Sequence, residues 1–203
     1  MDARKTSATS LDDVLALKDY GYRLEAFRHI GNCLLSQHRP LLIVETGSMR
    51  PGGSSDGDGH SSMLWDWIVR QTGGAFYTID IDPANTTYTQ PLLSKNSHAF
   101  TMESLKFFST SKFLHPIDLL YLDSMDWMGE LYDKMLSSLH HVGELAAAWK
   151  YVAAGGIIAV DDCYGPLEGK HALVECFFNM LEVPPFMTGP IYAWQKPLGV
   201  LSK

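Results

Sequence analysis

The chain has 203 residues, of which 46% are hydrophobic and 19% are charged, so it can bury the core of one α/β domain. Its net charge of −7 and the lack of any Lys/Arg run argue against nucleic acid as a partner. No apolar run approaches the about 18 residues of a membrane span, residues 1–10 lack a signal-peptide core, and three cysteines without a C-x-x-C pair favour a reducing, cytoplasmic location without a zinc cluster.

Residues 1–39 predict a helical segment that precedes the sheet. Ser10, followed three residues later by Asp13, resembles a helix N-cap. Leu11–Gln37 then shows helical spacing of apolar residues, with a break expected near Gly21. The pattern does not decide whether this segment packs on the edge of the sheet or covers a ligand, and both arrangements stay open.

The stretch Leu41–Gly47 predicts a buried strand that leads into a glycine-rich loop ending at Gly59. After the loop, Leu64, Trp67 and Ile68 fall at helical spacing. A buried strand, a glycine loop and a helix form the entry of a Rossmann-like sheet, in which ligands bind beyond the carboxyl ends of the strands. Glycines let the backbone approach such a ligand, and N–H groups at the start of the helix favour negative charge.

Three known loop motifs fit this glycine run poorly. A phosphate-binding P-loop needs a lysine where Asp58 stands, and a dinucleotide fingerprint would follow the strand directly. The sequence around Ser55 has the Gly-x-Ser-x-Gly letters of a nucleophile elbow, but it begins several residues after the strand. A hydrolase remains an alternative, with a triad of Ser55, Asp161 or Asp162, and His171.

Further apolar segments predict the remaining strands and helices. Strands are expected at Ala75–Asp80, Ser97–Met102, Ile117–Leu122 and Ile157–Val160, with Phe186–Trp194 and Pro197–Leu201 as closing antiparallel strands. Helices are expected after Ser104, over Gly129–Tyr151 and over Gly169–Leu181. We therefore predict an α/β fold: a Rossmann-like, doubly wound, mostly parallel seven-stranded sheet with helices on both faces, formed by residues 40–203 within a single domain.

Carboxylates follow several of these strands. Because the carboxyl ends of parallel strands share one edge of a sheet, Asp80, Asp123 and the pair Asp161-Asp162 are expected to lie near one another. Asp123, Asp161 and Asp162 would repel one another without a cation, and they could supply hard oxygen ligands to Mg²⁺. Alternatively, each of them caps the helix or turn that follows. Asp80 could accept both hydroxyls of a ribose, with Asp82 as the competing residue or a simple turn-former.

Taken together, these motifs resemble a class I S-adenosylmethionine-dependent methyltransferase. The resemblance spans residues 40–165 and rests on Val44-Glu45-Thr46-Gly47, Thr78-Ile79-Asp80, Leu120-Tyr121-Leu122-Asp123 and Ala154–Asp162. The pattern of one Asp followed later by Asp-Asp is similar to that of metal-dependent O-methyltransferases of the catechol and macrocin types. The Gly52-Gly53-Ser54 stretch is similar to the cephalosporin hydroxylase group, which shares this fold.

The resemblance implies a cofactor site and a metal site at the same edge. Cofactor contacts are implied beside the methionine part (Glu45, Gly47, Ser48), at the ribose (Asp80, Ile81), at the adenine (Glu103, Ser104) and at Asp123. The metal, Mg²⁺ or Mn²⁺, would be bound by Asp123, Asp161 and Asp162.

The general base is the least defined part of the implied site. The family often places a basic or acidic residue directly after the strand-four Asp, but Ser124 and Met125 follow here, and Asp126 is the nearest candidate. His140 and His141 are further candidates, or simply an exposed pair on a helix.

The implied activity is methyl transfer from S-adenosylmethionine to a hydroxyl of a small molecule such as a sugar, phenol or natural product. A non-catalytic S-adenosylmethionine-binding protein is the other alternative besides the hydrolase. No nucleic acid or membrane partner is expected, and the sequence leaves a homo-oligomer open.

Overall fold

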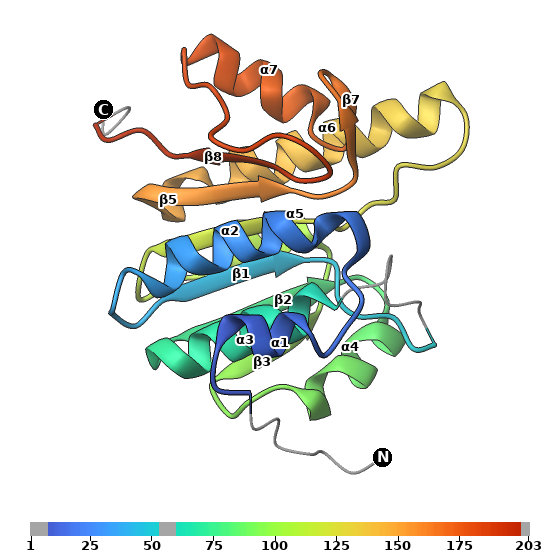
Figure 1. Ribbon diagram of the computed structural model, residues 1–203. Coiled ribbons are helices and arrows are strands. Elements are labelled where there is room, and N and C mark those ends of the chain that lie inside the picture. Colours follow the sequence, from blue (N-terminus) through green and yellow to red (C-terminus); the bar gives the residue numbers. More distant parts are fainter. Residues whose placement is uncertain (1–7, 53–59, 200–203) are drawn as a thin grey trace.

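The computed structural model describes residues 8–52 and 60–199 of the chain. Within these ranges, six strands form the main sheet in the order β3-β2-β1-β4-β5-β8 (Figure 1). The strands are β1 (Leu42–Thr46), β2 (Ala75–Asp80), β3 (Ser97–Thr101), β4 (Ile117–Leu122), β5 (Val152–Val160) and β8 (Tyr192–Gln195). Neighbouring strands run parallel except β8, which pairs antiparallel with β5. The predicted α/β, mostly parallel sheet is confirmed.

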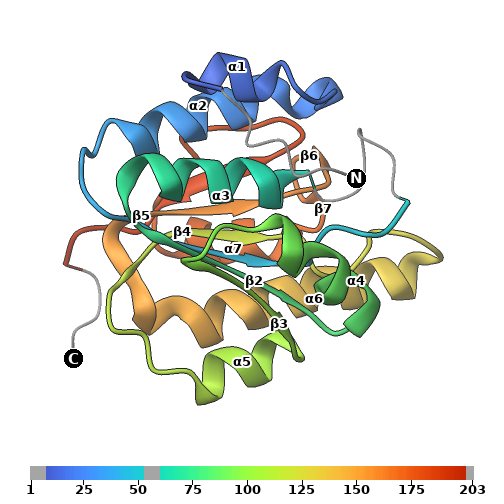
Figure 2. The same cartoon turned by 90° about the horizontal axis from the view of Figure 1, so that it is seen from below.

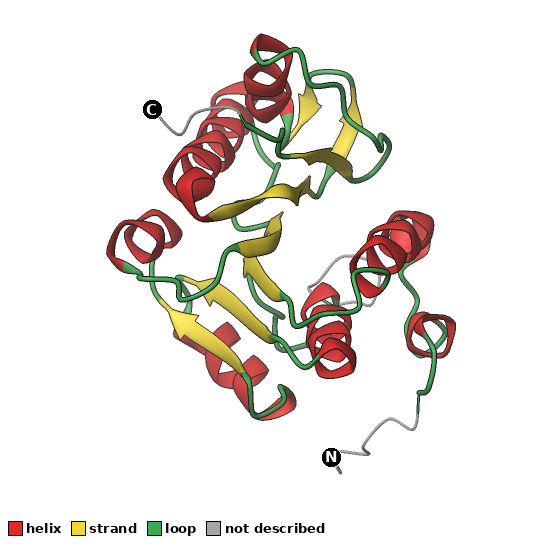
Figure 3. Cartoon of the chain, turned by 90° about the vertical axis from the view of Figure 1, so that its left-hand side faces the viewer, coloured by secondary structure: helices red, strands yellow, loops and turns green. Residues whose placement is uncertain are grey.

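Helices cover both faces of the sheet (Figures 2 and 3). One face carries α1 (Leu11–Leu15), α2 (Leu24–Leu35) and α3 (Ser61–Thr72), and the other carries α5 (Ser104–Thr110), α6 (Leu131–Ala148) and α7 (Ala172–Met180). The short helix α4 (Pro83–Thr89) lies against β2 and β3. A small hairpin of β6 (Cys163–Gly165) and β7 (Glu168–Gly169) follows β5.

Alternate residues of the central strands feed two separate cores. Ile43 and Tyr121 pack with α1, α2 and α3, whereas Val44 and Leu120 pack with α5, α6 and α7. Because both faces are covered, β1 and β4 are buried along their whole length. This two-sided burial explains why the strands appear in the sequence as continuous apolar runs.

Most predicted elements are present with small shifts of their ends. The bounds of β2 and β4 are those predicted, and Ser10 is the predicted N-cap of α1, where it forms a capping box with Asp13. The predicted helix over Leu11–Gln37 is interrupted by a 3-10 turn that begins at Gly21, whose φ of +51° favours glycine. Asp82 is the N-cap of α4, a helix that the sequence analysis did not predict.

The closing part of the sheet differs from the predicted seven strands. Of Phe186–Trp194, only the end joins β8, and Met187 makes an isolated bridge to Ala193. Pro190 cannot donate a ladder hydrogen bond, which keeps the segment before β8 out of the sheet. Within Pro197–Leu201, residues 197–199 are not in a strand, and the rest lies outside the described residues.

The N-terminal segment packs on α3 and on one face of the sheet. Leu11, Val14 and Leu15 are buried in the core on that face. The Trp67 indole N–H donates to the carbonyl oxygen of Ala8 over 3.4 Å. After α1, the chain turns toward the carboxyl edge of the sheet and brings Arg23 there. Across the described ranges, no helix has both the length and the apolar character needed to cross a membrane.

Phe27 is the centre of the aromatic packing between α2 and the sheet. It is fully buried, and its ring lies 5.1 Å from Tyr20, 5.6 Å from Trp65 and 6.1 Å from Tyr121, measured between ring centroids.

Phe27→Ala should therefore lower the free energy of unfolding by about 3–5 kcal/mol in urea denaturation. The exposed Leu17 serves as the control, because Leu17→Ala should change it by no more than about 0.5 kcal/mol. Similar losses in both variants would contradict this packing.

Candidate active site

The turn after β1 requires a glycine. Gly47 has a φ of +87°, and a Cβ at this position would overlap the backbone carbonyl oxygen of Asp123. Its N–H donates to the carbonyl oxygen of Ile79 over 2.7 Å, and the Asp123 N–H donates to the carbonyl oxygen of Thr46 over 3.0 Å. The turn therefore ties the carboxyl ends of β1, β2 and β4 together.

Asp80 organises the backbone on the β2 side of this turn. One carboxylate oxygen accepts from the Ser48 N–H at 2.9 Å and from the Asn85 amide at 3.0 Å. The other oxygen accepts from the Asp82 N–H at 2.8 Å. The carboxylate is thus fixed at the end of β2, in the place where the sequence predicted a ribose-binding residue.

A pocket of about 220 Å³ opens between the ends of β1, β2 and β4, the start of α5 and the middle of α6. It is lined by Gly47, Ile79, Asp80, Ile81, Met102, Glu103, Ser104, Ser124, Met125 and His140. Most of the predicted cofactor contacts therefore meet in one place. Ile81 leaves 73% of its surface exposed, which is high for an apolar side chain and gives the pocket an apolar wall. Glu103 also caps α5 by accepting from the N–H groups of Leu105 and Lys106.

Glu45, another predicted cofactor contact, lies below this surface. Its carboxylate is buried and accepts hydroxyl hydrogen bonds from Ser61 at 2.7 Å and Ser62 at 2.5 Å. Burial raises the pKa of Glu45 to about 8, against the opposing effect of the two hydroxyls. In this position Glu45 joins β1 to the first turn of α3.

The three predicted bases occupy different environments. Asp126 accepts from Arg50 at 2.8 Å, and this ion pair outweighs burial and lowers the pKa of Asp126. His141 is buried in α6, its Nδ1 lies 2.7 Å from the carbonyl oxygen of Ser137, and burial lowers its pKa to about 4. His140 lines the pocket, and the hydrogen bond that its Nε2–H donates to the Glu144 carboxylate raises its pKa.

Glu144 is a buried residue that the sequence analysis did not identify. Its carboxylate accepts from the hydroxyl of Thr46 at 3.1 Å and from that of Ser124 at 2.8 Å, and it lies 3.2 Å from Nε2 of His140. It therefore connects α6 to the ends of β1 and β4. Its position in the middle of a helix gave no local signal of this role.

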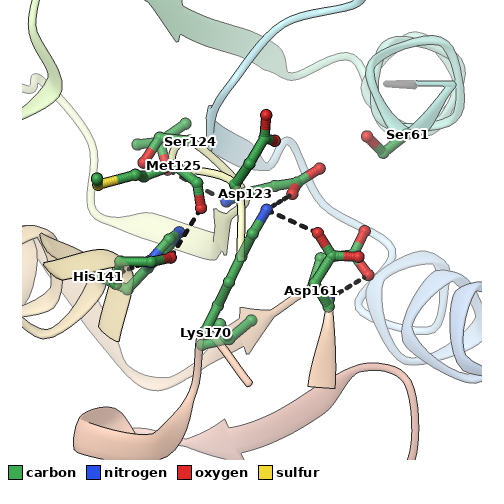
Figure 4. A network of polar contacts seen from close by, with 12 residues as sticks. Ser61, Asp123, Ser124, Met125, His141, Asp161 and Lys170 are labelled. Carbon is green, nitrogen blue, oxygen red and sulfur yellow. Dashed lines mark hydrogen bonds and ion pairs between the residues drawn. The ribbon is translucent and has the colours of Figure 1, made fainter. Parts of the chain in front are cut away.

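Two of the predicted metal ligands are bridged by a lysine (Figure 4). The Nζ atom of Lys170 lies 2.5 Å from Oδ1 of Asp123 and 2.9 Å from Oδ2 of Asp162. Burial opposes the charge on Lys170, but the two carboxylates outweigh it and raise the pKa of the lysine above its usual range. Lys170 therefore stays cationic between the ends of β4 and β5.

The third predicted metal ligand, Asp161, is paired with an arginine from the N-terminal segment. Its Oδ2 accepts from Arg23 at 2.6 Å and from the Tyr121 hydroxyl at 2.6 Å. Asp161 and Arg23 are both buried. A buried carboxylate that lacked such a partner would be strongly unfavourable, so Arg23 and Asp161 depend on each other.

This arrangement does not fit the magnesium site that the sequence pattern predicts. A lysine ammonium lies between Asp123 and Asp162, and Asp161 is held by Arg23 and Tyr121. Among the residues that the structure describes, no group of three or more His, Cys, Asp or Glu side chains could hold a metal ion. The positive charge beside the carboxylates comes from Arg23 and Lys170.

The hydrolase alternative gains no support from the structure. Ser55 lies outside the described residues. His171 is buried against Tyr192, with ring centroids 4.0 Å apart, and its Nε2 lies 3.4 Å from Glu175. Asp161 is already paired with Arg23.

Solved structures of methyltransferases share this fold. The MycE methyltransferase of the mycinamycin biosynthetic pathway, in complex with Mg, SAH and mycinamycin VI, matches 98% of this chain with a TM-score of 0.67 and 12% identity. The match covers 57% of MycE, so this chain spans little more than half of that protein. The O-methyltransferase NovP matches 87% of this chain and 80% of its own, with a TM-score of 0.56 and 18% identity.

A putative rRNA-methylase from Clostridium thermocellum also matches, with a TM-score of 0.54 and 13% identity, over 87% of this chain and 97% of its own. No family model and no curated protein matches the sequence. At these identities the likeness shows the fold alone, which this chain shares with these methyltransferases.

Replacement of Gly47 should be far more costly than replacement of another glycine in the same loop. Gly52 also has a left-handed φ, of +76°, but no atom of the residues that the structure describes lies within 4 Å of the place where its Cβ would be. Both Gly→Ala changes cost about 1 kcal/mol of backbone strain, and Gly47→Ala should lose roughly 1–3 kcal/mol more from overlap with Asp123. Differential scanning calorimetry of the two variants measures this difference. Equal melting temperatures of the two variants would contradict the expected overlap between a side chain at position 47 and the Asp123 backbone at the end of β4.

Glu45 should make stability depend on pH. The folded protein holds the Glu45 proton more tightly than the unfolded chain, because the pKa rises from 4.5 to about 8 on folding. The free energy of unfolding should therefore fall as pH rises through this interval. Glu45→Gln cannot ionise, so it should be more stable than the wild type by on the order of 2–4 kcal/mol at pH 8, with a smaller difference at pH 5. Urea unfolding of both proteins at pH 5 and pH 8 measures this difference. The same difference at both pH values would contradict the expected titration of Glu45.

Proposed function

We propose that this protein is an S-adenosylmethionine-dependent O-methyltransferase that acts on a hydroxyl of a small molecule. The observation that carries the proposal is the pocket at the carboxyl edge of the sheet. There the Gly47 turn, the fixed Asp80 carboxylate and the exposed Ile81 lie together on a methyltransferase fold.

The lining of the pocket suits the parts of the cofactor. Asp80 can accept hydrogen bonds from ribose hydroxyls, as strand-end carboxylates do in Rossmann-like folds. Ile81 offers an apolar surface for the adenine, and Ser104 and Glu103 border the same space. When bound, S-adenosylmethionine supplies a methyl group on a positively charged sulfur. The residues of this chain would hold that group in line with an acceptor oxygen and keep water away.

The acceptor would enter beside Asp162. Asp162 directly precedes Cys163, which lines a hollow of about 430 Å³. The other residues that line it are Tyr22, Tyr164, Gly165, Gly189, Pro190 and Tyr192. Tyr22 and Tyr164 are more than half exposed, and aromatic faces of this kind suit a sugar or phenol ring. Of the predicted bases, His140 lines the cofactor pocket beside Ser104, which borders the adenine, so we assign none of them to the proton of the acceptor.

A small-molecule acceptor is favoured over RNA by charge. The fold also occurs in a putative rRNA-methylase, so the fold alone does not choose the acceptor. The net charge of −7 and the carboxylates at the site oppose a phosphate backbone. The MycE complex contains a small molecule, mycinamycin VI, beside SAH, which supports the same class of acceptor here. Metal dependence is left out of the proposal because the carboxylates do not fit a metal.

Cofactor binding should depend on Asp80. Asp80→Ala should weaken the binding of S-adenosylhomocysteine by roughly ten- to a hundredfold in isothermal titration calorimetry, through loss of charge-assisted hydrogen bonds. Asp82→Ala is the matched control, since Asp82 caps α4 two residues further along and should leave the affinity within about threefold of the wild type. No heat of binding to the wild-type protein would refute the proposed function. Equal affinities of the Asp80 variant and the wild type would remove Asp80 from the site.

A further inference from the structure

The segment after β5 is folded so that Lys170 returns to the end of that strand. The hairpin of β6 and β7 reverses the chain, and the Lys170 N–H donates to the carbonyl oxygen of Asp162 over 3.2 Å. Gly169 has a φ of +132°, and a Cβ there would overlap the Asp162 carbonyl. The Ser138 hydroxyl of α6 donates to the carbonyl oxygen of Gly169 over 3.1 Å. The backbone of Lys170 is therefore fixed by the hairpin and by α6.

The side chain of Lys170 lies behind the two carboxylates. Its ammonium is 2.5 Å from Asp123 and 2.9 Å from Asp162, and only 1% of the side chain is exposed. The side chains of Asp123 and Asp162 remain 17% and 29% exposed. The two carboxylates are therefore partly open to solvent, while the buried ammonium contacts both and offsets one of their two negative charges.

We propose that the Lys170 ammonium is a built-in cation that takes the place of a divalent metal between the ends of β4 and β5. A Mg²⁺ ion needs oxygen ligands at about 2.0–2.1 Å in a near-octahedral arrangement. The ammonium already contacts the carboxylate oxygens that would have to supply two of these ligands. Arg23 and Tyr121 hold the third carboxylate, Asp161, in the same way. The site therefore keeps its carboxylates in place without a metal ion.

This arrangement changes how an acceptor is recognised, a consequence that rests on the proposed function. A metal centre binds two adjacent acceptor oxygens by chelation. Here an acceptor meets carboxylate oxygens, which accept hydrogen bonds. One hydroxyl of the acceptor can donate to a carboxylate without a second oxygen beside it. The acceptor then needs no vicinal pair of oxygens.

Metal binding by purified variants tests the proposal without any knowledge of the acceptor. The free-ion signal of Mn²⁺ in electron paramagnetic resonance measures binding, and thermal unfolding is followed in the same samples. The wild type should bind no stoichiometric Mn²⁺, and millimolar Mn²⁺ should change its Tm by less than about 1 °C. Lys170→Ala removes the cation and leaves two facing carboxylates. It should lower Tm by about 5–15 °C, and Mn²⁺ should bind and restore about 5 °C or more.

Two further variants identify the site of any binding. Lys170→Ala combined with Asp162→Asn removes one of the two carboxylates and should lose the gained Mn²⁺ binding. Arg23→Met also removes a buried cation, but it leaves one carboxylate beside Tyr121, so it should lose stability without gaining Mn²⁺ binding.

Either of two results would overturn the proposal. One is stoichiometric Mn²⁺ binding by the wild type that Asp162→Asn abolishes. The other is a folded Lys170→Ala protein that ignores Mn²⁺. If Lys170→Ala does not fold, the wild-type titration and the same experiment with Lys170→Gln decide the question. Cofactor affinity measured separately shows whether the proposed function fails, because Asp80 and not Lys170 is expected to hold the cofactor.

Discussion

The carboxyl edge of this sheet depends on the neutralisation of three carboxylates that the fold brings together. Taking a carboxylate out of water costs several kcal/mol unless a well-placed cation compensates for it. Arg23 compensates Asp161, and Lys170 compensates Asp123 and Asp162. One cation arrives from the segment before the sheet and the other from the hairpin after β5. Both segments must therefore be in place before the ends of β4 and β5 are stable.

The sequence predicts the scaffold well because the scaffold is governed by local patterns. Both faces of the sheet are covered, so β1 and β4 are buried along their whole length and appear as apolar runs in the sequence. The gathering of Asp123, Asp161 and Asp162 also follows from parallel topology. The partners of these carboxylates do not. Arg23 is 138 positions from Asp161, and no local signal joins them. Lys170 stands eight positions after Asp162, and the surplus of negative charge was the available hint that a nearby cation would be needed.

Side-chain direction explains the rest of the difference at the site. Successive residues of a strand point to opposite faces, so a position at a strand end does not by itself face the ligand. Glu45 points to the α3 side, where Ser61 and Ser62 hold it, whereas Thr46 points to Glu144 on the other side. His140 and His141 differ in the same way on α6: one reaches the pocket and the other is buried. The sequence analysis named Glu45, His140 and His141 as candidates but could not give the orientation of their side chains.

The position of Lys170 also makes this residue informative about related chains. In any chain that keeps three acidic residues at these strand ends, their charge has to be balanced from some source. A chain with a basic residue at the end of the hairpin supplies the positive charge from its own side chain, so every molecule of the protein has it. A chain with a neutral residue there must obtain it from the surrounding medium. The identity of one side chain, eight positions beyond an Asp-Asp pair, would then divide such proteins into those whose site depends on ion supply and those whose site does not.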